Sequence, residues 1–200
     1  MTNIDKVRSV SIWIFIIPFL AVNTCLIIVT NFHEILEPGV PINPTFPYFD
    51  GEVSISRTVR DYPLYLIFKP AMFITSFLLV HYWLNTKKII NFFDENYIHT
   101  KKIIFFGIGS AILLTIHSIF LGIKFDNDLY KLFRRVVMLS FIIFELIAQA
   151  YLINFFYKFK NEILNFINEF YLRLKRILIT ALISISIIVL PFLPFDNFKF

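Results

Sequence analysis

Long apolar runs separated by shorter polar segments dominate the pattern of this chain. A helix needs roughly 20 mostly apolar residues to cross about 30 Å of hydrocarbon at a rise of about 1.5 Å per residue. Five runs approach or exceed that length. The pattern therefore predicts an all-α, polytopic transmembrane helical bundle that forms a single integral membrane domain over residues 1–200. The expected spans are Ser9–Phe32, Leu64–Leu84, Ile103–Ile123, Val136–Tyr157 and Ile177–Leu193.

Composition supports a membrane environment and narrows the chemistry. Hydrophobic residues make up 58% of the chain and the mean hydropathy is +0.72, against roughly 45–50% apolar residues in soluble domains. Cys25 is the single cysteine, so neither a disulfide framework nor a multi-cysteine metal site can form. The four histidines fall at unmatched depths, which argues against a haem site. No metal or cofactor is expected.

The distribution of positive charge indicates an orientation. Lys6 and Arg8 precede the first run, which is longer than a signal h-region and has no small-x-small cleavage site after it. We interpret it as a retained helix with a cytoplasmic N-terminus. Five crossings then place eleven of the 19 Lys and Arg residues on the cytoplasmic side, as the positive-inside rule favours. The net charge is +5, but the Lys and Arg residues cluster at the ends of the spans and no nucleic-acid-binding motif is present. The composition suggests a bacterial inner membrane.

The connection over residues 33–63 is expected to be a long external loop. Five of the nine prolines lie between Asn31 and Pro63, and their spacing of three over Pro38–Pro47 favours an extended, polyproline-like chain. Hydroxyl and guanidinium groups follow, and such groups recognise phosphate well. The alternative is a solvated loop with interfacial charges. The predicted lipid-headgroup contact comprises Ser54, Ser56, Arg57, Arg60 and, from the second span, Lys69.

Glu145 is the most unusual residue within the apolar runs. It lies about 13 Å from the start of the fourth run, close to the bilayer midplane, where a carboxyl group is expected to face the bundle interior. Gln149 follows one turn later on the same face. His117 of the third run is expected about 5 Å away in depth, and a Glu–His pair would suit proton transfer or acid–base catalysis. The alternative is an interhelical hydrogen bond that helps the bundle assemble.

The third run also contains a stretch of small residues, Gly107-Ile108-Gly109-Ser110-Ala111. No strand precedes it and it lies in an apolar run, so a nucleotide-binding loop is excluded. Ser110 and His117 are two turns apart on one helix, which does not suit a nucleophile–base pair from different helices. The stretch predicts close helix–helix packing.

The first two runs and their connection resemble a known membrane-protein family. Phe46-Pro47-Tyr48-Phe49-Asp50-Gly51 is followed by Ser54-Ile55-Ser56, Tyr62-Pro63 and Ile67-Phe68, and the helix after them ends at Tyr82-Trp83. Over about residues 1–85 this order resembles the Frag/DRAM/Sfk family, also described as the CWH-type N-terminal domain. The resemblance implies six or so spans, so we expect either a lost helix or a truncated reading frame. The residues that carry the resemblance include no established catalytic residue of that family.

These features favour an integral membrane protein that interacts with or senses membrane lipids and is not self-evidently an enzyme. One alternative is an intramembrane lipid-modifying enzyme that uses Glu145 and His117 as catalytic acid and base. Another is a small transporter or a subunit of a membrane complex, although no inverted repeat supports a transporter. The expected partners are membrane lipids and other membrane subunits, in a homo- or hetero-oligomer; nucleic acid is not expected.

Overall fold

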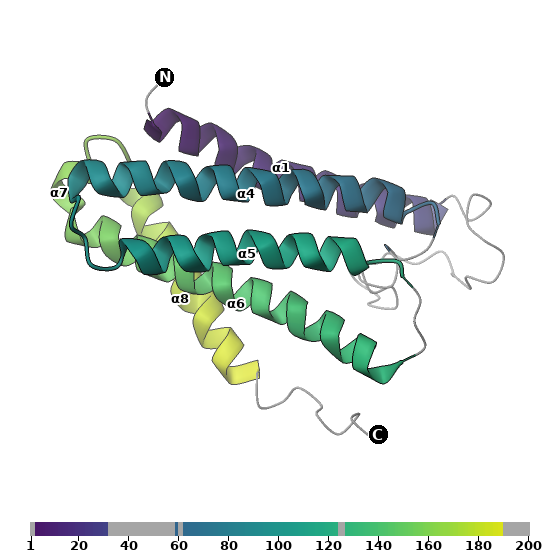
Figure 1. The fold of residues 1–200 in the computed structure, drawn as a ribbon. Coiled ribbons are helices and arrows are strands. Elements are labelled where there is room, and N and C mark those ends of the chain that lie inside the picture. Colours follow the sequence, from purple (N-terminus) through teal and green to yellow (C-terminus); the bar gives the residue numbers. More distant parts are fainter. Residues whose placement is uncertain (1–2, 32–58, 60–61, 124–126, 190–200) are drawn as a thin grey trace.

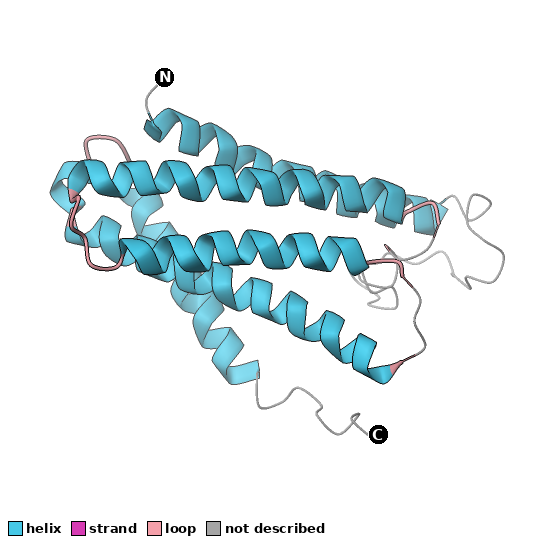
Figure 2. Ribbon diagram, viewed as in Figure 1, coloured by secondary structure: helices cyan, strands magenta, loops and turns pink. Residues whose placement is uncertain are grey.

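The computed structural model describes residues 3–31, 59, 62–123 and 127–189. Within these ranges every regular element is an α-helix, and short turns join α4 to α5 and α7 to α8 (Figure 2). The all-α class is therefore confirmed for the part of the chain described. The helices are α1 (Asn3–Asn31), α4 (Tyr65–Phe93), α5 (Thr100–Phe120), α6 (Asp128–Lys158), α7 (Lys160–Ile163) and α8 (Glu169–Val189).

The long helices run back and forth as antiparallel neighbours (Figure 1). Helix α1 packs against α4, α4 against α5, α5 against α6, and α6 against α8. The start of α1, the α4–α5 turn and the α6–α8 connection lie at the same end of the bundle, which we call the α7 end (Figure 1). Because the connections at this end are short, each helix folds back onto the one before it.

Four of the described helices are long and apolar enough to cross a membrane: Asn3–Thr30, Tyr65–Phe93, Thr100–Phe120 and Leu129–Lys158. They contain most of the first four predicted spans and extend beyond them, since polar residues such as Lys87 and Lys88 continue the helix past the apolar run. Helix α8 is different. Cations occupy its first two turns, and the apolar stretch from Ile177 to Val189 is about 20 Å long, less than the thickness of the hydrocarbon. The fifth crossing stays a prediction.

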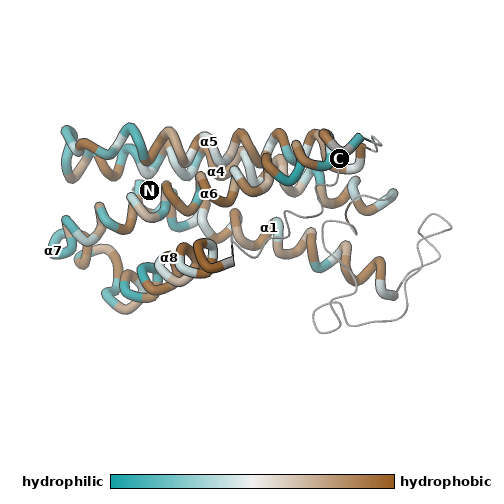
Figure 3. Tube along the Cα trace, turned by 90° about the horizontal axis from the view of Figure 1, so that it is seen from below, coloured by the Kyte–Doolittle hydropathy of each residue, from teal (hydrophilic) through white to brown (hydrophobic). Residues whose placement is uncertain are grey.

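Large apolar side chains cover the outer surface of the helices. Phe15, Phe77 and Phe105 are 66%, 72% and 65% exposed. Contiguous apolar exposure on this scale would favour aggregation in water, but hydrocarbon solvates it well. The ends differ: hydrophilic residues gather near α7 and in the first turns of α8 (Figure 3). The surface therefore matches a bundle that has its middle in lipid and its ends in water.

The interior combines apolar packing with hydroxyl groups that bridge helices. Trp83 and Ile103 are fully buried at the interface of α4 and α5. Two turns before Trp83 on α4, the Ser76 hydroxyl donates to the carbonyl of Ala111 on α5 at 2.7 Å and is also hydrogen-bonded to Thr115. In lipid, where the hydrophobic effect does not drive helices together, such contacts and close packing hold the helices in register.

Candidate functional site

The carboxyl group of Glu145 lies in the bundle interior, where three helices meet. The Ser110 hydroxyl of α5 donates to Oε2 at 2.7 Å, and the Trp83 indole of α4 donates to the same oxygen at 3.3 Å. On its own helix, Gln149 Nε2 donates to Oε1 at 2.8 Å. Glu145 thus faces α4 and α5, and Gln149 lies on the same face of α6.

Both carboxyl oxygens of Glu145 are thus engaged by donors from its neighbours. A half-buried polar group so far from water needs such partners, because an unsatisfied group there is costly. Ser110 also donates to the Gly107 carbonyl at 2.8 Å, which holds its hydroxyl in place. This arrangement fits the packing alternative for Glu145, in which one carboxyl group ties α4, α5 and α6 together.

Two glycines allow the helices to approach closely at this level. A Cβ atom on Gly107 would overlap the ring of Trp83, and one on Gly109 would lie 2.7 Å from Cδ1 of Phe144. The indole therefore occupies space that only glycine leaves on α5, and this position lets its N–H reach Glu145. The prediction that the small residues serve helix packing is confirmed.

His117 lies two turns further along α5 than Ser110, about 10 Å by helical rise. The hydrogen bonds found for Glu145 are with Ser110, Trp83 and Gln149, so the carboxyl group sits at the level of Ser110. That offset is about twice the depth difference expected from the sequence. The catalytic Glu145–His117 pair stays a prediction, and the described contacts do not bring the two residues together.

The predicted lipid-headgroup contact falls mostly on residues whose structure is not described. Lys69 is its described member. Its ammonium group donates to the carbonyl of Ile119 at 3.3 Å and lies 5.5 Å from the centre of the Tyr65 ring. Lys69 thus joins the start of α4 to the last turn of α5, where a cation is favourable because the helix dipole leaves carbonyl groups exposed. Ser54, Ser56, Arg57 and Arg60 lie outside the described residues.

A cavity of about 640 Å³ opens at the α7 end of the bundle. Helix α1 forms one wall with Val7, Arg8 and Ser11, and α8 forms another with residues around Leu172 and Lys175. Side chains of α4, α6 and the α7–α8 turn complete it. The volume lies within the range of about 300–1,000 Å³ that is common for small-molecule sites. The remaining lining residues are Ile4, Tyr82, Ile89, Phe93, Phe156, Ile163, Phe166, Ile167, Asn168 and Tyr171.

The lining is mostly apolar, with a few convergent polar groups. Tyr82 is 7% exposed, and within the described part of the chain its hydroxyl has no hydrogen-bond partner. Lys175 is half-buried and its ammonium lies 5.6 Å from the centre of the Phe156 ring, so an aromatic wall of the cavity holds the cation. Among the described lining residues none is acidic. The cavity is therefore electropositive over an apolar floor.

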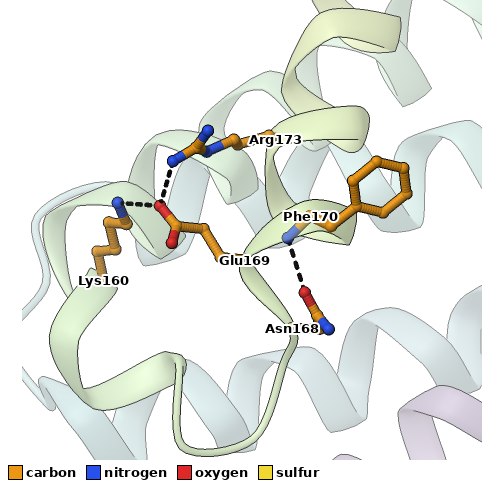
Figure 4. A network of polar contacts seen from close by, with 5 residues as sticks. All are labelled: Lys160, Asn168, Glu169, Phe170 and Arg173. Atoms are coloured by element: carbon orange, nitrogen blue, oxygen red, sulfur yellow. Dashed lines mark hydrogen bonds and ion pairs between the residues drawn. The ribbon is translucent and has the colours of Figure 1, made fainter.

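An ion-pair network fixes the start of α8 beside this cavity (Figure 4). The Glu169 carboxylate accepts hydrogen bonds from Lys160 at 2.6 Å and from Arg173 at 2.9 Å. These two cations, Lys160 first, hold the pKa of the Glu169 carboxyl below its ordinary value. The Asn168 side chain accepts from the N–H of Phe170 at 2.8 Å and caps the helix. The network joins α7 to α8 and so positions Lys175, which lies nearly two turns after Glu169.

Comparison with protein-family models, curated proteins and solved structures gave no match. The Frag/DRAM/Sfk resemblance therefore stays a prediction. Among the described residues no group of three or more His, Cys, Asp or Glu side chains is arranged to hold a metal ion.

Sequence reasoning identified Glu145 and Gln149 but missed the cavity. Its residues come from five separate elements and share no motif, so only the fold brings them together. One signal is present in the sequence: Ile163, Ile167 and Tyr171 recur at helical spacing after the fourth span, which is typical of an amphipathic helix. The structure divides this segment into α7, a turn and the first turns of α8.

Proposed function

We propose that this protein is a multi-pass integral membrane protein that binds a membrane lipid in the cavity between α1 and α8. The observation that carries the proposal is the cavity itself, which combines an apolar floor with Arg8 and Lys175 at its walls. A lipid has the same two chemistries, an acyl part and a polar head. The four long apolar helices support the membrane location.

Charge at the two ends of the bundle supports the proposed orientation. Eleven Lys and Arg residues of the described part lie toward the α7 end, whereas four lie toward the opposite end. The positive-inside rule assigns the more basic end to the cytoplasm. The proposal therefore keeps the N-terminus cytoplasmic and the five-crossing topology, in a bacterial inner membrane. The cavity then opens at the level of the inner leaflet.

A direct test is photo-crosslinking with a phospholipid that carries a diazirine in its acyl chain, added to the full-length chain in detergent. We expect saturable labelling of peptides that contain Val7 and Leu172, with competition by unlabelled lipid. The variant Val7→Trp should reduce this labelling because the indole fills part of the cavity. The matched control is Ile12→Trp, on the same helix but 51% exposed and outside the cavity. Labelling that is not saturable, or that V7W leaves unchanged, would refute the proposal.

A further inference from the structure

The cavity at the α7 end has a charge pattern that distinguishes one class of lipid from another. Arg8 of α1, which is exposed, and Lys175 of α8, which is half-buried, both line it, so two cations from different helices border one cavity. Within the described part of the chain neither residue forms an ion pair, although Lys160 and Arg173 nearby are both paired with Glu169. Both cations that line the cavity therefore have no carboxylate partner among the described residues.

The remaining polar groups of the cavity are suited to donate hydrogen bonds. Tyr82 is 7% exposed as a residue and lines the cavity, and its hydroxyl has no hydrogen-bond partner among the described residues. The side-chain oxygen of Asn168 already accepts a hydrogen bond from the N–H of Phe170, so its NH₂ group is the part that can donate to a ligand. Cations and N–H or O–H donors that converge without a competing acid recognise an oxyanion, above all a phosphate.

We infer that the cavity takes an anionic phospholipid of the inner leaflet, with its phosphate between Arg8 and Lys175 and an acyl chain along the apolar floor of α4 and α6. This inference rests on the proposed function and names the lipid class for the same site. Charge complementarity decides the class: a zwitterionic lipid would bring its own ammonium group next to two cations, whereas a lipid with net negative charge would not.

Trp83 provides a local optical probe of this site. Its indole is fully buried, and its ring centre lies 5.0 Å from that of Tyr82, which lines the cavity. The second tryptophan, Trp13, is 52% exposed on the outer face of α1. In a Trp13→Phe background, quenching by brominated lipid reports on Trp83; in a Trp83→Phe background, it reports on lipid at the outer surface.

The experiment uses the full chain in phosphatidylcholine vesicles that contain a minor fraction of brominated phosphatidylglycerol or brominated phosphatidylcholine. In the Trp13→Phe background we expect phosphatidylglycerol to quench Trp83 with about a tenfold higher apparent affinity than phosphatidylcholine. The double variant R8Q/K175Q should lose this preference, and R8K/K175R should keep it. The matched control K101Q/K102Q removes two charges from the same end at exposed positions outside the cavity, and it should behave like the wild type.

The outcomes separate the lipid class from lipid binding itself. Saturable quenching of Trp83 that is equal for the two lipids overturns the anionic class and leaves the proposed function standing. Quenching of Trp13 but not of Trp83 by either lipid overturns both. A preference that survives R8Q/K175Q, in protein that melts at the wild-type temperature, overturns the role of these two cations.

Discussion

Ser110 of α5 and Glu145 of α6 are joined by a hydrogen bond of 2.7 Å, and this bond lies at the level where α4 also meets both helices. The pair shows how a bundle with an apolar surface is held in register from inside. Apolar contact with lipid costs the separated helices nothing, so polar bonds and close packing must supply the specificity. Glu145 accepts hydrogen bonds from α4 and from α5, so it fixes the positions of three helices relative to one another.

Loss of the Ser110 hydroxyl should weaken the bundle. In Ser110→Ala the Oε2 atom of Glu145 keeps only the longer bond from Trp83. Hydrogen bonds between membrane helices contribute about 0.6 kcal/mol on average and up to about 1.7 kcal/mol, and we expect a loss toward the upper value because Glu145 remains. Unfolding in detergent measures it. Ser186→Ala is the control, since that exposed hydroxyl bonds only to Leu182 of its own helix; equal losses in both variants would contradict the interhelical role.

Glu145→Gln should separate packing from acid–base chemistry. The amide fits the same space, and Glu145 does not line the cavity, so lipid labelling there should stay at the wild-type level while thermal stability falls modestly. Photo-crosslinking and a melting curve on the same preparation give both readouts. A folded variant with the wild-type melting temperature that has lost lipid labelling would instead favour proton transfer at Glu145.

Gly107→Ala should destabilise the protein through steric overlap rather than through lost bonds. The new methyl group would occupy the position of the Trp83 ring, and overpacking in a well-packed interior typically costs about 1–3 kcal/mol. Trp83→Leu should relieve part of this cost, so the double variant is expected to lose less than the sum of the two single ones. Strict additivity would show that the two residues are not in contact. Ile112→Ala, 53% exposed on the same helix, serves as the control.

The attachment of α7 to α8 should weaken in acid. The cations Lys160 and Arg173 lower the pKa of Glu169 in the folded protein. A group with a lowered pKa stabilises the fold above its unfolded pKa, and this contribution is lost as the pH falls through the folded value. The melting temperature of the wild type should therefore approach that of Glu169→Gln below about pH 4 and exceed it at pH 7. Because the group is exposed, the difference should be small and should shrink in high salt. A constant difference across the pH range would contradict this assignment.

The sequence predicted the helices better than it predicted their contacts. Apolar runs of about 20 residues identify helices in lipid because the bilayer imposes one length on every span, and the described part of the chain contains four such helices. Helix ends were less accurate: α6 begins at Asp128, eight residues before the predicted span, since Asn127 caps it at the water-exposed end. The helices continue past the apolar runs through amphipathic segments, and the thickness of the bilayer does not limit the length of these segments.

The partners of Glu145 show where the pattern was insufficient. Gln149 was predictable because residues four apart share a helix face. Ser110 and Trp83 depend on the rotation of α5 and α4 about their axes, and that rotation is set by which side chains fit against Gly107 and Gly109. A depth estimate alone therefore favoured His117. The same limit applies to the cavity, whose walls meet only after α8 folds back onto α6.

The final prediction concerns the proposed topology, in which the chain crosses the membrane five times and has a cytoplasmic N-terminus. In a Cys25→Ala background, single cysteines at Asn96 and Asn165 lie in the turns at the α7 end, and one at Asn127 lies at the opposite end. A membrane-impermeant maleimide added to intact cells should label N127C alone, whereas inside-out vesicles should give label at N96C and N165C. Asn96 and Asn165 lie in turns, so their substitution should leave the helices intact. N127C removes the side-chain cap of α6, which typically costs about 1 kcal/mol and should affect only its first turn. Labelling of N96C in intact cells would reverse the orientation, and it would move the cationic cavity to the outer leaflet.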